Sequence, residues 1–362
     1  MTTLLSPVTG LGFLIAIFWQ VQRLRHERKV FNTAIDRHAT GLWAGLIGGI
    51  GVALLVSLAA LGLGLMVPKA VWLAVSGLCL AALVLSILGF SPWYLGLAGV
   101  TALLLDAPQN GWQWQVIALV ALLWLAESAV LHFIDPPIDV PTIKLGKRGA
   151  DIAVYDHRQL YWLPLVLPIS GSTFSSLPWW ATLHVGAAHF ALIGLPVILG
   201  VMLRTKKQLP QHATHQWAIQ YLVAAGLAAL LAAVAAWLGQ LALYALIALA
   251  VLGAAVGLAN RWALRAGSNY ISQTTSGVRI VAVLPETPAA AMGLVAGDIV
   301  MLCNAQPVHQ VAELYAAIQA HPTYCRLRVQ RLDGEIKLCE TAIYEGAPHT
   351  LGMITFAEEL AK

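Results

Sequence analysis

The sequence contains very little charge. Only 10% of its 362 residues are Asp, Glu, Lys or Arg, whereas 59% are hydrophobic. Soluble domains are about 25% charged and about 45–50% apolar. This scarcity of charge excludes an ordinary soluble protein and indicates a chain that is largely embedded in a membrane.

Catalytic and metal-binding patterns are also missing. The four cysteines form no Cys-x-x-Cys pair, so we expect free thiols in a reducing compartment: Cys79, Cys303, Cys325 and Cys339. Nothing matches the His-Glu-x-x-His zinc motif of membrane-embedded proteases. Its nearest approach, His184 and His189, lacks the glutamate, and residues five apart on a helix point in different directions. We therefore predict no enzymatic activity, no metal and no cofactor.

The basic residues form no continuous stripe, so nucleic-acid binding is not expected. They are nevertheless uneven. Residues 1–265 hold 15 Lys and Arg against 8 Asp and Glu, whereas residues 266–362 hold 6 against 9. This difference predicts two domains, a multi-span membrane part over 1–265 and a soluble part over 266–362.

The apolar runs predict a polytopic α-helical bundle. A membrane-spanning helix needs about 20 mostly apolar residues. Such runs fall near 4–21, 42–67, 70–88, 92–105, 114–133, 160–177, 180–203, 217–238 and 241–263. The run at 92–105 is short and that at 160–177 contains two prolines, so we expect eight or nine spans.

Basic loops give the orientation of these spans. Lys and Arg gather in the loops near 23–37, 134–160 and 204–216 and after residue 260, while the alternate loops hold almost none. Short basic loops favour the cytoplasm. Strict alternation through nine spans puts all of them, and the C-terminal domain, on the cytoplasmic side. The basic stretch Arg23–Lys29 is also a candidate contact for anionic membrane lipid.

The last ninety residues predict a small α+β domain. Strand patterns cover 277–284, 298–303, 324–331 and 335–342, and short helices are expected at 287–293 and 310–319. The stretch from Val278 to Val300, with Gly293-Leu294 and Gly297-Asp298, resembles the PDZ signature. The resemblance implies a domain that binds extended peptides as an added strand.

A candidate peptide site follows from this resemblance. No carboxylate-binding glycine turn precedes Val278, but Thr350–Phe356 offers one at the end of the chain, an order that resembles circularly permuted PDZ domains. Leu351, Gly352 and Met353 would then form the carboxylate cradle, and the groove strand would run from Ile354 to Phe356. The helical wall would consist of Val311, Tyr315 and Ile318. The alternative is a plain terminal strand that only fills the sheet.

Short motifs along most of the chain resemble the MinJ family, the PDZ-containing division-site determinants of Gram-positive rods. They are Arg23–Phe31, Leu125–Val130, Gly146–Gly149, Tyr161–Leu165, Glu313–Tyr315, Ile343–Gly346 and His349–Gly352. The resemblance implies an adaptor that bridges a MinD-like ATPase and a DivIVA-like polar protein, and so helps to restrict septum placement. It also implies a multi-pass cell-membrane protein at septum and poles.

A transporter or channel with a regulatory PDZ domain is the second hypothesis. It would use ionisable groups within the spans as a relay, whereas an adaptor would keep them as hydrogen bonds between helices. The candidates are Glu127, His132, His184 and His189.

Overall fold

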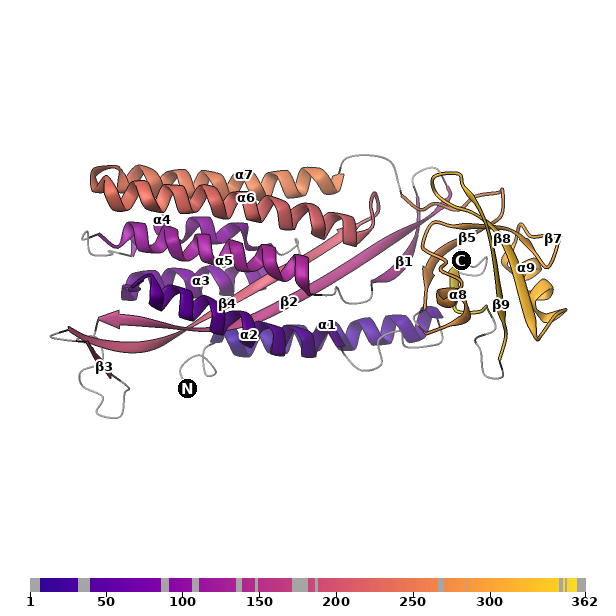
Figure 1. The fold of residues 1–362 in the computed structure, drawn as a ribbon, viewed down its shortest axis with the longest axis horizontal. Coiled ribbons are helices and arrows are strands. Elements are labelled where there is room, and N and C mark those ends of the chain that lie inside the picture. The colour runs from indigo at the N-terminus through magenta and orange to yellow at the C-terminus, as the bar shows by residue number, and fades with distance from the viewer. Residues whose placement is uncertain are drawn as a thin grey trace.

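The computed structural model describes residues 7–31, 40–85, 91–105, 111–134, 139–146, 149–170, 182–185, 188–265, 270–284, 286–344, 348 and 350–356. Apolar helices lie roughly along the long axis of the molecule, and the C-terminal domain lies at one end (Figure 1). A long pair of strands runs between the helices and reaches this domain. The composition predicts two parts, the apolar helices and the C-terminal domain. The structure adds a long pair of antiparallel strands, here called the hairpin, which connects them.

The helices of the membrane part are α1 (Pro7–Phe31), α2 (Thr40–Gly62), α3 (Lys69–Val84), η2 (Pro92–Leu97), α4 (Ala98–Leu104), α5 (Gln113–Phe133), α6 (Pro210–Trp237), η4 (Gly239–Leu241) and α7 (Ala242–Arg265). Within the described residues, four helical stretches are long and apolar enough to cross a membrane: Gly45–Gly62, Gln113–Phe133, Pro210–Trp237 and Gly239–Arg265. These helices indicate membrane association. The expected 8–9 spans are not confirmed, and Arg23–Lys29, predicted as a loop, continues helix α1.

The predictions of spans at 160–177 and 180–203 are wrong where the structure describes them. Strand β2 covers Asp151–Ser170 and strand β4 covers Ala188–Thr205. They pair antiparallel without interruption from Tyr155↔Thr205 to Ser170↔Phe190. Two short strands flank them, β1 (Val140–Leu145) beside β2 and β3 (Thr182–Val185) beside β4.

Composition explains this outcome. Both segments contain proline, which breaks a helix interior, and Pro164 and Pro196 lie directly opposite each other in the hairpin. Both are also rich in β-branched and aromatic residues, which favour strands. Because both faces of this strand pair are largely buried, residues 160–169 of β2 and 190–203 of β4 are apolar, and hydropathy alone does not distinguish them from a spanning helix.

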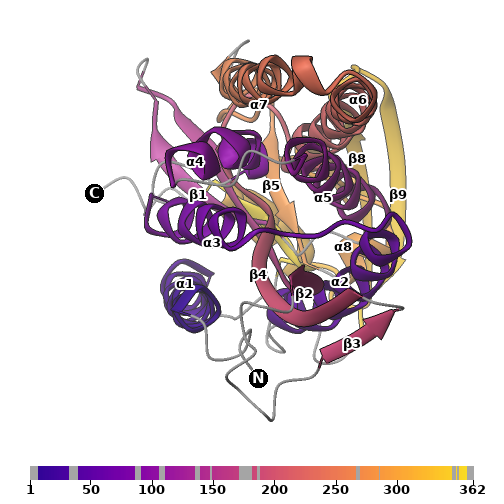
Figure 2. The ribbon, with the colours of Figure 1, turned by 90° about the vertical axis from the view of Figure 1, so that its left-hand side faces the viewer.

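The helices surround the hairpin, as the end view in Figure 2 shows. A strand edge inside an apolar bundle is costly unless its backbone groups find partners. Helical side chains provide such partners. Two side chains accept hydrogen bonds from strand amides: Ser57 Oγ from Val166 N (2.9 Å) and Glu127 Oε2 from Gly200 N (2.7 Å). Two others donate to strand carbonyl groups: Trp72 Nε1 to Gly194 O (3.0 Å) and Tyr94 Oη to Ile198 O (3.2 Å). The buried Glu127 therefore holds a strand edge.

Helix α2 packs directly on the backbone of β2. A Cβ atom at Gly45 would overlap the carbonyl oxygen of Leu160, and one at Gly49 would overlap that of Trp162. Gly51, on the same helix, has open space around it. Gly45 and Gly49 thus allow a helix to pack directly on a strand.

The histidine candidates lie in different places. His184 in β3 and His189 in β4 are opposite each other in the register, in strands and not in the predicted seventh span. His132 is near the end of α5, where its ring lies 5.9 Å from that of His215.

The C-terminal domain matches the sequence prediction closely. It contains β5 (Val278–Val283), α8 (Pro288–Ala291), β6 (Ile299–Cys303), β7 (Gln306–Pro307), α9 (Val311–Gln319), β8 (Tyr324–Gln330), β9 (Ile336–Ala342) and β10 (Met353–Thr355). The strands are ordered β10-β5-β6-β8-β9, with β7 paired to β6. Residues 266–269, at the predicted boundary between the two domains, lie outside the described residues.

Candidate peptide-binding site

The candidate groove strand, β10, lies at the end of the domain's sheet. It pairs antiparallel with β5 through Met353↔Val283 and Ile354↔Ala282, and the register shifts before Thr355. No strand in the described part of the chain pairs with its other edge. An end strand of this kind can accept an extended peptide as an additional strand.

The predicted cradle forms a tight turn before β10. Leu351 and Gly352 both have positive φ angles, 57° and 89°. A Cβ atom at Gly352 would overlap the side chain of Thr287, so only glycine fits there. The turn is attached to the β5–α8 connection because Leu284 N donates to Gly352 O and Ala289 N donates to Leu351 O, each at 2.9 Å.

Two of the cradle amides, those of Leu351 and Met353, already have partners within the turn. Leu351 N donates to Pro348 O at 2.8 Å, and Met353 N donates to Thr350 O at 2.9 Å. A bound carboxylate would therefore have to share or replace these turn bonds. The structure thus brings the three cradle residues together in one turn with two positive φ angles.

Helix α9 and the cradle contribute to one apolar core. Ile318, Leu351 and Met353 are buried in the same cluster, and Val311 packs against it. Tyr315 is half-buried and its hydroxyl accepts a bond of 2.6 Å from Gln319 Nε2. The side chains of Leu351 and Met353 therefore fill the domain, which leaves their backbone as the surface that could meet a ligand.

Glu313 fixes the start of α9. Its carboxylate accepts hydrogen bonds from the amides of His309 (2.7 Å) and Gln310 (3.3 Å). The His309 amide is the main reason that the pKa of this carboxyl lies below its usual range. The predicted helical wall is thus held by a charged cap at its N-terminus.

Ile354 and Phe356, which the sequence analysis placed in the groove strand, have side chains that point away from the candidate groove. Both are buried in a second cluster with Ala153 and Tyr155 of strand β2 and with Val281 of β5. The side chains on this face of β10 therefore contact the base of the hairpin. If these two residues contact a peptide, they do so through their backbone.

The sequence analysis missed this contact between the two parts of the chain. Tyr155 Oη donates to Val281 O at 2.6 Å. Beside it, the chain that enters the domain adds to the hairpin, with Ala153 N donating to Ile271 O (3.1 Å) and Gln273 N donating to Asp151 O (2.8 Å). A strand pattern at 151–156 was the available signal, but the basic loop predicted there concealed it.

Comparison with known proteins agrees with this architecture. The PDZ domain family model matches residues 279–331, which end before β10. A 62-residue stretch is 39% identical to the periplasmic serine endoprotease DegP of Salmonella typhimurium, covering 17% of this chain and 13% of that protein. The C-terminal domain is therefore a PDZ domain.

Two relatives match nearly the whole chain. A Lacticaseibacillus paracasei protein named "Probable cell division topological determinant MinJ" is 38% identical over 99% of this chain and 98% of its own length. The Bacillus subtilis cell division topological determinant MinJ is 27% identical over 95% of this chain and 93% of its own length. The membrane part, the hairpin and the PDZ domain are all included in these alignments. The chain therefore belongs to the MinJ family of cell division topological determinants.

Proposed function

We propose that this chain is a multi-pass membrane adaptor without catalytic activity, whose PDZ domain binds extended segments of cell-division proteins and recruits them to septum and poles. The observation that carries the proposal is the outer edge of β10, which no described strand covers, in a PDZ domain attached to apolar helices. By family resemblance, the partners are a MinD-like ATPase and a DivIVA-like polar protein.

The distribution of basic residues supports a cytoplasmic PDZ domain. Lys144, Arg204 and Arg265 come from three separate segments and lie around one pocket. The base of the hairpin beside the PDZ domain is where these segments meet (Figure 1). Replacing two predicted spans by a hairpin leaves both of its ends on one side, so the orientation argument from basic loops is unchanged.

The hydrogen bond between Glu127 and Gly200 supports an adaptor over a transporter. A relay needs a carboxylate that exchanges protons with a pathway, whereas this one accepts a backbone N–H at 2.7 Å. We therefore assign Glu127 a structural role in keeping the hairpin edge satisfied.

Two glycines offer a matched test of the peptide site. Gly352 in the cradle and Gly334 in the β8–β9 turn both have φ of 89°, but only at Gly352 would a methyl group overlap a neighbour. Both full-length alanine variants carry the same backbone penalty, about 1 kcal/mol. Crosslinking and co-purification from a Gram-positive host should show roughly tenfold less partner with Gly352→Ala.

The Gly334→Ala variant should retain its partners. Thermal unfolding of both proteins in detergent establishes that each is folded at the temperature of the assay. Equal partner recovery with the two folded variants would refute the placement of the cradle. Absence of any division protein with the unaltered chain would refute the adaptor function itself.

A further inference from the structure

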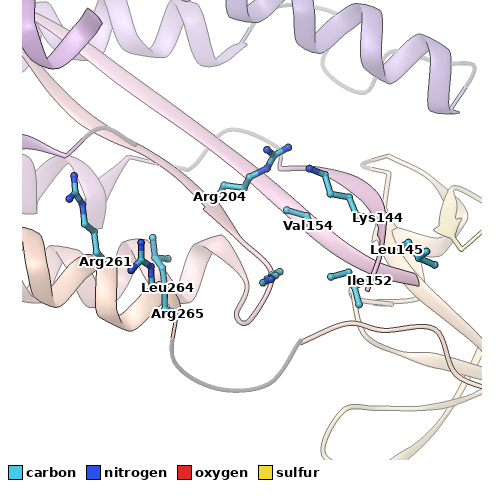
Figure 3. Close-up of a pocket in the computed structure, with 9 residues that line it drawn as sticks. Lys144, Leu145, Ile152, Val154, Arg204, Arg261, Leu264 and Arg265 are labelled. Atoms are coloured by element: carbon cyan, nitrogen blue, oxygen red, sulfur yellow. The ribbon is translucent and has the colours of Figure 1, made fainter. Parts of the chain in front are cut away.

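A basic pocket of about 560 Å³ lies between the base of the hairpin and the end of helix α7 (Figure 3). Five of its lining residues are cationic and four are aliphatic: Lys144, Arg204, Lys206, Arg261 and Arg265, with Leu145, Ile152, Val154 and Leu264. None of the described residues that line it is acidic. Peptide recognition by the PDZ domain uses none of these side chains.

Two features offset part of this positive charge. Asp156 Oδ1 lies 2.8 Å from Arg204 Nε, and the C-terminus of α7, beside Arg261 and Arg265, carries about half a negative charge. The carbonyl oxygen of Arg265 also accepts a bond from Lys207. One carboxylate and one helix end do not balance five cations, so the pocket has a positive potential that attracts an anion.

The position of the pocket along α7 points to the level of lipid headgroups. The stretch from Ala242 to Asn260 contains no charged residue and is roughly 28 Å long at 1.5 Å per residue, close to the hydrocarbon thickness of a bilayer. Trp237 before it is 87% exposed and Trp262 after it is 76% exposed. Tryptophans with such exposure are typical of the two membrane interfaces.

We propose that this pocket binds the phosphate of an anionic phospholipid headgroup. Guanidinium groups bind phosphate oxygens in a bidentate way, and an ammonium group adds a point charge. The aliphatic side is suited to the glycerol and first methylene groups, since Leu145 is 72% exposed at the rim. A soluble phosphate ester would have the same charged chemistry. It would gain no binding energy from the apolar lining or from the position of the pocket at the level of the lipid headgroups. The proposal requires α7 to cross the membrane and is independent of peptide binding.

The test uses the full chain in nanodiscs of phosphatidylcholine containing a minor fraction of phosphatidylglycerol, followed by mild detergent extraction and native mass spectrometry of retained lipid. The variant Arg261→Gln/Arg265→Gln removes two exposed cations from the pocket. Arg326→Gln/Arg328→Gln removes two exposed cations from strand β8 and is the matched control. We expect phosphatidylglycerol retention to fall on the order of tenfold or more in the pocket variant and to stay unchanged in the control.

A second variant and a soluble competitor complete the test. Lys144→Gln/Lys206→Gln changes the hairpin side of the pocket and should reproduce the loss. Because it leaves α7 unaltered, the loss cannot then be attributed to a local defect in that helix. Equal retention by pocket and control variants would overturn the proposal. Binding of glycerol phosphate or inorganic phosphate to the detergent-solubilised chain as strongly as phosphatidylglycerol would also overturn it, because the ligand would then be a soluble anion.

Discussion

The hydroxyl of Tyr155 donates a hydrogen bond to the carbonyl oxygen of Val281 at 2.6 Å, and so connects the hairpin of the membrane part to the first strand of the PDZ domain. Tyr155 is buried in this contact, together with Ile354 and Phe356 of β10. The strand that borders the candidate peptide site is thus supported from behind by a strand of the membrane part. A peptide added at the outer edge of β10 and the membrane part packed on one face would therefore share this strand.

Tyr155→Phe should loosen this connection without disturbing either part. It leaves the carbonyl oxygen of Val281 without its buried partner, which costs about 1–3 kcal/mol. Hydrogen exchange of the full chain in detergent should show faster exchange in β5 and β10. Tyr344→Phe, at a position that is 77% exposed, is the control and should leave exchange unchanged. Identical exchange in both variants would mean that the bond does not hold the domains together.

Substitutions of Glu127 distinguish a structural carboxylate from a relay. Glu127→Gln keeps an oxygen that can accept from Gly200 N, so yield and partner localisation should be close to those of the unaltered chain. Glu127→Leu leaves that amide without an acceptor in an apolar environment and should reduce the yield of folded protein severely. Loss of partner localisation in Glu127→Gln at normal yield would show that the carboxylate itself is required. This result would contradict the structural role and favour the transporter hypothesis.

Glycines on α2 should differ sharply in their tolerance of a methyl group. Gly49→Ala brings a Cβ atom onto the Trp162 backbone, whereas Gly51→Ala meets open space. Overpacking costs about 1–3 kcal/mol when side chains can move, and more against a backbone. Thermal unfolding in detergent should show a clear loss of stability at position 49. The Gly51 variant should unfold like the original chain, and similar unfolding of both variants would refute direct packing of α2 on β2.

Asp298 predicts a pH dependence within the PDZ domain. Burial raises the pKa of its carboxyl above the ordinary value of 3.8, and its Oδ2 accepts from Val295 N at 3.0 Å. Because the folded-state pKa is the higher one, the stability contribution is fully present below the unfolded pKa and is lost as pH rises through the folded pKa. Asp298→Asn should therefore gain stability relative to the original chain as the pH rises above the ordinary pKa of the carboxyl, about 4. A constant difference as the pH rises would contradict the shift.

The sequence predicts the PDZ elements well because their signals are local. Asp333-Gly334 makes the β8–β9 turn, in which Gly334 has φ of 89°, and Pro288 opens helix α8 after Thr287. The hairpin was not predictable in the same way. What makes β2 a strand is its pairing with β4 and its cover of helices, and neither is visible in a hydropathy window. Pro164 and Pro196 were the available warnings, but prolines also occur in membrane helices.

The prediction of the candidate site had a similar limit. Leu351, Gly352 and Met353 were predicted to form one turn from the resemblance to circularly permuted PDZ domains, and the turn is present with the glycine at a positive φ angle. The burial of Ile354 and Phe356 against Tyr155 depends on the position of the membrane part, about two hundred residues away in the sequence. Local patterns contain no information on such a contact.

The hairpin also has a consequence for how this protein is made. A helix satisfies its own backbone as it leaves the translocation channel, but β2 beyond Asp156, which β1 does not reach, has no strand partner for its N–H and C=O groups until β4 has been synthesised. Strand β2 therefore cannot enter lipid by itself. We expect it to be held in an aqueous or protein-lined environment after α5, and to move into place only when β4 follows, so that β2 and β4 are inserted together.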